Sequence, residues 1–183
     1  MKLALLFSVV AFSCLAKMIT SKTFRDSAYV DLLMEINKDA EETLNTIFFS
    51  SAHERKENVT YNNLSNFLQS KIQEIHKNAR KIYDLQHIPS KWNRKSKEQL
   101  QNILQVSKQL KVNTDKRKRL GKQELKEITK KLVETSRNIK GLAQDYYYAQ
   151  KRFMTYDELA DITEIILNFN ELTSKALKIL SKM

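Results

Sequence analysis

Apolar residues recur along this chain at intervals of three and four, the spacing that places them on one side of an α-helix. The pattern predicts five helical segments. The first three cover about residues 24–50, 63–85 and 91–112, the fourth lies between Gly121 and Gly141, and the fifth begins at Thr155 and extends past residue 177. Because no strand pattern interrupts them, we expect an all-α fold, in which about five long amphipathic helices form one bundle or array.

The borders between these segments carry ordinary helix-start and helix-stop signals. Pro89 ends the second helix and Ser90 caps the third, while Gly121 and Gly141 bound the fourth. The sequence Thr155-Tyr156-Asp157-Glu158 is a capping box and is the clearest helix start in the chain. The three consecutive tyrosines of residues 146–148 therefore fall between two expected helices, where we predict a packed connection.

Three residues in these patterns bear on which side chains enter the core. Tyr83 continues the apolar spacing of the second segment, and Leu159 and Leu177 continue that of the fifth. The periodicity predicts that all three face the interior.

The first 16 residues have the form of a secretory signal peptide. A basic start at Lys2 precedes an apolar run too short to span a bilayer, and Cys14 and Ala16 place small side chains at the expected cut. An uncleaved anchor, or a lipoprotein acylated on Cys14, is the alternative. We expect cleavage after Ala16, secretion, and a single helical domain over residues 17–183.

Two acceptor sequences for N-linked glycans follow in the predicted secreted part. They are Asn58-Val59-Thr60 and Asn63-Leu64-Ser65. Behind a signal peptide, sequons so close together favour a glycan on Asn58 or Asn63, in a surface loop or at a helix end.

Composition excludes several classes of protein. With 2 Gly and 1 Pro, the chain lacks the turns of a β-sandwich and any glycine-rich phosphate loop. A single Cys excludes a disulfide scaffold and every multi-cysteine metal site. A mean hydropathy of -0.52 excludes a polytopic membrane protein.

Catalytic motifs are missing from the sequence. His53-Glu54-Arg55-Lys56-Glu57 begins like the helix of a zinc peptidase, but Glu57 stands where the second histidine ligand is required. No Gly-x-Ser-x-Gly elbow is present either. We therefore assign no catalytic residue, no metal ligand and no cofactor.

Positive charge is the strongest compositional feature. The formal net charge is +11, and ten Lys and Arg residues fall between Lys108 and Lys131. Among them Lys122, Lys126 and Lys130 are spaced four apart and share one side of the fourth helix. For a secreted protein this predicts an anionic glycan, an anionic membrane surface or an acidic protein as partner, and not nucleic acid. The alternative is an ordinary solvated helix surface.

Several short motifs occur in an order that resembles one known family. They are Tyr29-Val30-Asp31, the sequon at Asn58, residues 120–127 (Leu-Gly-Lys-Gln-Glu-Leu-Lys-Glu), and Tyr156-Asp157-Glu158-Leu159. This order resembles the amino-terminal lid helices of the angiotensin-converting enzyme family of zinc peptidyl-dipeptidases. The resemblance covers residues 28–180 and implies a helical lid over a peptide cleft.

The chain also departs from that family. His53 and Arg55 occupy positions where the family has aromatic residues, and the predicted secreted part has no cysteine for the family's first disulfide. The zinc-binding helix has no counterpart in the 183 residues. The resemblance thus implies a truncated, noncatalytic relative that binds a peptide or a full-length paralogue. The alternative is an unrelated secreted helical carrier for lipid or anionic glycans.

Overall fold

The computed structural model describes residues 28–50, 59–84, 94–115 and 121–182 of the 183-residue chain. Five helices account for nearly all of this part. The first covers residues 28–50 and is followed by α2 (Val59–Asp84), α3 (Arg94–Asp115), α4 (Lys122–Gln150) and α5 (Tyr156–Lys182). No described residue lies in a strand, so the predicted all-α fold is confirmed.

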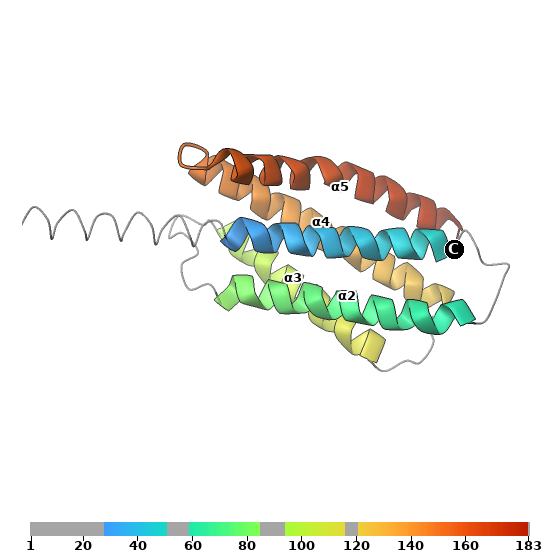
Figure 1. The fold of residues 1–183 in the computed structure, drawn as a ribbon. Helices are drawn as coiled ribbons and strands as arrows, with labels where there is room; N and C mark the ends of the chain where they lie inside the picture. Colours follow the sequence, from blue (N-terminus) through green and yellow to red (C-terminus); the bar gives the residue numbers. More distant parts are fainter. Residues whose placement is uncertain (1–27, 51–58, 85–93, 116–120, 183) are drawn as a thin grey trace, which may run out of the picture.

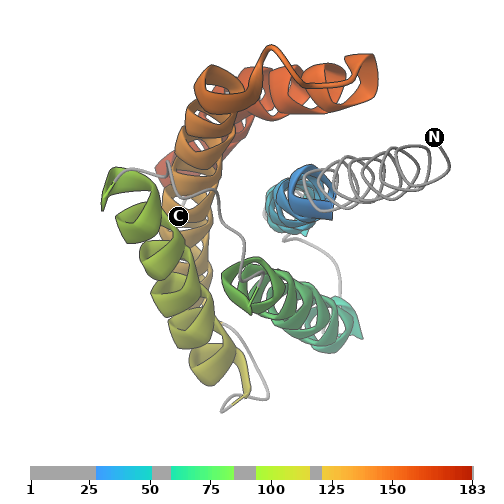
Figure 2. The same ribbon diagram turned by 90° about the vertical axis from the view of Figure 1, so that its left-hand side faces the viewer.

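The helices form an antiparallel array. Each runs back along the one before it, and the end of α5 lies beside the end of the first helix (Figure 1). Seen along their length, α2, α3, α4 and α5 follow one another in an arc, with the first helix on its inner side (Figure 2). The first helix therefore occupies the centre of the fold.

Side-chain contacts agree with this central position. The ring of Tyr29 lies 5.1 Å from that of Tyr146 on α4. Lys175 of α5 lies 3.6 Å from Glu41, and the ammonium of Lys182 lies 5.0 Å from the ring centre of Phe48. A helix with neighbours on several sides needs a broad apolar face, and the first helix has one. Its fully buried apolar residues are Val30, Leu33, Ile36, Ala40, Leu44 and Ile47.

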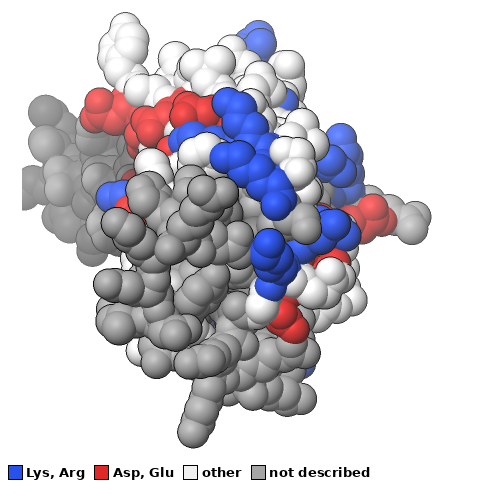
Figure 3. Space-filling view, turned by 90° about the vertical axis from the view of Figure 1, so that its right-hand side faces the viewer, with Lys and Arg blue, Asp and Glu red and all other residues white. Residues whose placement is uncertain are grey.

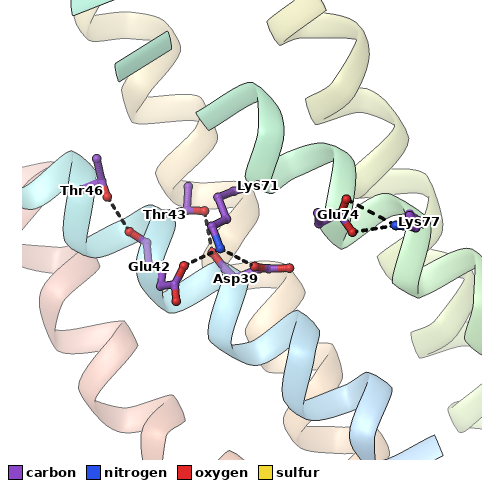
Figure 4. A network of polar contacts seen from close by, with 7 residues as sticks. All are labelled: Asp39, Glu42, Thr43, Thr46, Lys71, Glu74 and Lys77. Carbon is purple, nitrogen blue, oxygen red and sulfur yellow. Dashed lines mark hydrogen bonds and ion pairs between the residues drawn. The ribbon is translucent and has the colours of Figure 1, made fainter. Parts of the chain in front are cut away.

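A small polar cluster joins the first helix to α2 (Figure 4). The Lys71 ammonium of α2 donates a hydrogen bond to Asp39 at 2.9 Å and also contacts the carboxylate of Glu42. One turn further, Thr43 donates to the backbone carbonyl of Asp39 at 2.5 Å. A buried carboxylate needs such a partner, because removal from water disfavours its charge.

The fourth predicted helix is longer than expected. Gly141 does not end it, and the three tyrosines of residues 146–148 belong to α4 and not to a connection. Gly141 is instead a point of close approach, because a Cβ atom there would lie 2.1 Å from Nε2 of Gln99 on α3. A helix continues through a glycine at a cost of about 1 kcal/mol, which packing against a neighbour offsets.

The capping box at the start of α5 is confirmed. The backbone N–H of Thr155 donates to the Glu158 carboxylate at 2.8 Å, and the N–H of Glu158 donates to Thr155 Oγ1 at 3.2 Å. These reciprocal bonds satisfy two N–H groups that a helix start otherwise leaves unpaired. The chain can therefore reverse between α4 and α5 within a few residues.

Three residues expected in the core lie at the surface instead. Tyr83 is 53% exposed, Leu159 is 38% exposed and Leu177 is 62% exposed. The core face of α5 consists of Ile162, Ile165, Leu172, Ala176 and Ile179. Leu159 and Leu177 have helical spacing relative to one another but lie outside that face.

Candidate anion-binding surface

The predicted basic face starts where α4 starts. Gly121 precedes the helix in an extended conformation, and Lys122 is the first helical residue. Residues Leu125, Ile128 and Leu132 turn one side of α4 into the core, which leaves the positions spaced four apart from Lys122 outside it. Lys122 and Lys130 are exposed and Lys126 is half-buried.

The structure extends this row by one residue that the sequence analysis did not include. Arg137 lies seven residues after Lys130, two turns further along the same side of α4, and it is exposed. We call Lys122, Lys126, Lys130 and Arg137 the basic ridge. The helical spacing of seven residues from Lys130 leads to Arg137. This residue lies beyond Lys131, where the dense run of Lys and Arg in the sequence ends.

A carboxylate of the same helix contacts Lys130 of the ridge. Lys130 lies 3.2 Å from Glu127, and both side chains are about half exposed, at 52% and 45%. Exposed ion pairs of this kind contribute about 0–1 kcal/mol and exchange readily. A polyanion that approaches the ridge can therefore displace Glu127 from Lys130 at little cost.

The other described basic residues between 108 and 131 lie apart from this row. Lys131 reaches α3 and donates to Oε1 of Gln109 at 2.5 Å. Lys108 and Lys111 belong to α3, and residues 116–120 lie outside the described residues. The described part of the cationic run is thus divided between α3 and α4, and Lys122, Lys126 and Lys130 of α4 form a row.

Seen from the end where α4 begins, basic side chains form a group across the middle of the molecule, with a patch of acidic side chains at its upper left and further acidic side chains to its right and below it (Figure 3). Acidic residues also crowd near the start of α5. There burial, followed by the charges of Asp31 and Glu164, raises the pKa of Asp161. A polyanion that approaches this face meets the group of basic side chains, while individual carboxylates such as Glu127 lie beside it.

His76 is the histidine within the described residues, and its environment is basic. Its Nδ1 lies 3.0 Å from Oγ of Ser107 on α3. Burial, followed by the nearby charges of Lys111, Arg80 and Lys108, lowers the pKa of His76. The imidazole is therefore neutral at pH 7 and joins α2 to α3 without adding charge.

The remaining predicted sites lie wholly or partly outside the described residues. Asn58 lies outside the described residues. Asn63 falls near the start of α2, but its side chain is also outside them. His53 is outside them too.

The described residues also bear on metal binding and on membrane crossing. Within residues 28–50, 59–84, 94–115 and 121–182, no three His, Cys, Asp or Glu side chains are placed to hold a metal ion. Over those ranges no helix combines the length and the apolar character needed to cross a membrane.

Comparison with family models, curated proteins and solved structures finds no match to this chain. The resemblance to the angiotensin-converting enzyme family therefore rests on its short motifs alone.

Proposed function

We propose that this protein is a secreted helical binding protein that holds sulfated glycans along the basic ridge of α4. The observation that carries the proposal is the ridge itself: Lys122, Lys126, Lys130 and Arg137 lie in one row on a single helix. Residues spaced four and seven apart cover about 20 Å of helix, since each residue adds about 1.5 Å. A linear polyanion can contact such a row at several points at once.

The packing of α4 supports a rigid ridge. Its opposite side is buried through Leu132, Ile139 and Leu142, and α4 packs against both α3 and α5. Cations held on a packed helix lose less freedom on binding than cations on a free segment. A guanidinium at Arg137 also provides paired N–H donors that suit a sulfate group.

Secretion is part of the proposal and rests on the signal-peptide pattern of residues 1–16. The peptide-binding function implied by the family resemblance rests on its motifs, and no contact of the described residues adds to it.

Chromatography on immobilised heparin tests the proposal. The variant Lys122→Glu/Lys126→Glu/Arg137→Glu should elute at much lower salt than the wild type, because its three reversals remove most ridge contacts. The matched control is Lys81→Glu/Lys95→Glu/Lys97→Glu, whose residues are exposed on α2 and α3. Both variants change the net charge equally.

The two variants separate a site from bulk charge. If the ridge binds the glycan, the control elutes close to the wild type while the ridge variant does not. Equal loss of retention in both would show that net charge alone is responsible, and the proposal would fail. Unchanged helix content by circular dichroism establishes that the variants remain folded.

A further inference from the structure

The outward side of α5 carries exposed apolar residues that the glycan proposal does not use. Tyr156 is 92% exposed, Leu167 is 65% exposed and Leu177 is 62% exposed. These three side chains lie opposite the core residues Ile165, Leu172 and Ile179 of the same helix. Burial of exposed side chains of this size is worth about 1.5–3 kcal/mol each, so a partner would gain from covering them.

The exposed residues are spaced as in a helix pair. Positions 156, 160, 163, 167, 174 and 177 are separated by three, four or seven residues, the intervals of a coiled-coil seam. We call these six residues the outer strip: Tyr156, Ala160, Thr163, Leu167, Ser174 and Leu177. A shallow groove lies within it, lined among others by Tyr156, Ala160, Thr163 and Leu167.

The outer strip has a groove at one end and a projecting side chain, Leu177, towards the other. The groove is centred on Ala160 and Thr163 in the first half of α5, whereas Leu177 projects from the second half. If two copies of α5 pack antiparallel, Leu177 of each copy faces Ala160 of the other, and Leu167 lies near the two-fold axis. The strip is therefore complementary to itself when one copy is reversed, as a symmetric dimer requires.

Charge along the edge of the strip agrees with the same orientation. Asp157 and Glu164 flank its first half and Lys178 flanks its end. Glu171, between them, is already paired with Lys175 at 2.8 Å. In an antiparallel pair Asp157 of one copy lies on the same side of the seam as Lys178 of the other, whereas in a parallel pair the two lie on opposite sides of it.

We propose that the protein forms a symmetric homodimer in which two α5 helices pack antiparallel along the outer strip. The helix has 27 residues and is about 40 Å long. One helix pair of this length buries less than the roughly 800 Å² per partner of a standard interface, so the dimer is weak, with a Kd in the micromolar range.

Sedimentation velocity of the whole protein over about 1–300 μM tests the association. The wild type should shift from monomer to dimer within this range. Leu177→Glu should weaken the dimer at least tenfold, and Tyr83→Glu should leave it unchanged, because Tyr83 is similarly exposed but lies on α2. Monomer throughout, or equal effects of the two variants, would overturn the proposal.

Cross-linking tests the orientation. In a Cys14→Ser background, which removes the natural cysteine, Ala160→Cys/Leu177→Cys should give a disulfide-linked dimer on mild oxidation. Ala160→Cys alone should give little, because position 160 faces position 177 and not itself. Efficient cross-linking of that single variant would show a parallel pair and refute the antiparallel dimer.

A charge exchange provides an independent readout. Asp157→Lys and Lys178→Asp should each weaken the dimer, and the two together should restore it, because the facing charges are then opposite again. Failure of the double variant to recover would contradict the proposed register. The ridge variant of α4 should dimerise like the wild type, which distinguishes this proposal from glycan binding.

Discussion

Lys71→Met should lower the free energy of unfolding by about 2 kcal/mol at pH 7. The substitution keeps the length of the side chain but removes the ammonium that contacts Asp39 and Glu42. The Asp39 side chain is 13% exposed, so its charge would lose its partner while largely shielded from water. Breaking a buried ion pair costs about 3–5 kcal/mol. We expect less here because the Lys71 side chain is 25% exposed and water can reach the cluster.

The effect should depend on pH. Burial raises the pKa of Asp39, although the hydrogen bond and charge of Lys71 lower it. Because its pKa is raised, Asp39 binds its proton more tightly in the folded state than in the unfolded state. Ionisation of Asp39 therefore opposes folding once the pH rises above the pKa that Asp39 has in the unfolded chain. Loss of Lys71 raises this pKa further. The destabilisation should therefore be small near pH 3.5 and grow towards pH 7.

Urea denaturation followed by circular dichroism at both pH values measures the change. Lys77→Met is the matched control, because Lys77 also pairs with a carboxylate but its side chain is 60% exposed. That control should change the stability by less than about 0.5 kcal/mol. Asp39→Asn in the Lys71→Met background should recover part of the loss. Equal stability of Lys71→Met and wild type at pH 7, or an equal loss at both pH values, would refute the reasoning.

Three further predictions concern other contacts. Glu158→Ala should reduce stability by about 1 kcal/mol in thermal denaturation, because it removes one half of the capping box with Thr155, and Glu158→Gln should retain most of it. Gly141→Ala should stabilise a Gln99→Ala background by about 1 kcal/mol through helix propensity and the wild type by less, because there the Gln99 amide must first shift away from the new methyl group; an equal gain in both backgrounds would exclude the steric explanation. Because the pKa of His76 is lowered in the folded state, the unfolded state binds the imidazole proton at a higher pH than the folded state does. The free energy of unfolding should therefore fall as the pH drops below 6.5. His76→Gln should make the free energy of unfolding, measured by urea denaturation, depend less on pH in this range.

The sequence predicted the helices well because apolar spacing reports local geometry. The second segment was expected over residues 63–85, and α2 covers Val59–Asp84. The capping box at Thr155 was also found, since its partners are three residues apart. Such features need no knowledge of neighbouring helices.

The failures concern contacts between helices. A glycine such as Gly141 is typical of a helix end. Only the approach of Gln99 from α3 shows that Gly141 lies where two helices pack closely. Leu177 has helical spacing, but the neighbours of α5 decide which side is buried, and they leave Leu177 exposed. The pairing of Lys71 with Asp39 joins residues 32 positions apart, which periodicity cannot detect.

The candidate site was predicted only in part. The sequence placed Lys122, Lys126 and Lys130 on one side of a helix, and the structure adds Arg137 to that row. It also shows that Lys131, next in the cationic run, faces Gln109 on α3. Charge density along a sequence does not say which cations share a surface, because adjacent residues on a helix point in different directions.

The salt dependence of glycan affinity tests the proposed function most directly. A size-defined heparin oligosaccharide is titrated into the whole protein by calorimetry at several salt concentrations. Four ridge cations should give a log–log slope of roughly −3, by analogy with counterion release from nucleic acids. Lys122→Glu/Lys126→Glu/Arg137→Glu should flatten the slope and weaken binding at least tenfold, and Lys81→Glu/Lys95→Glu/Lys97→Glu should leave the slope unchanged. Equal slopes for wild type and ridge variant would contradict the account.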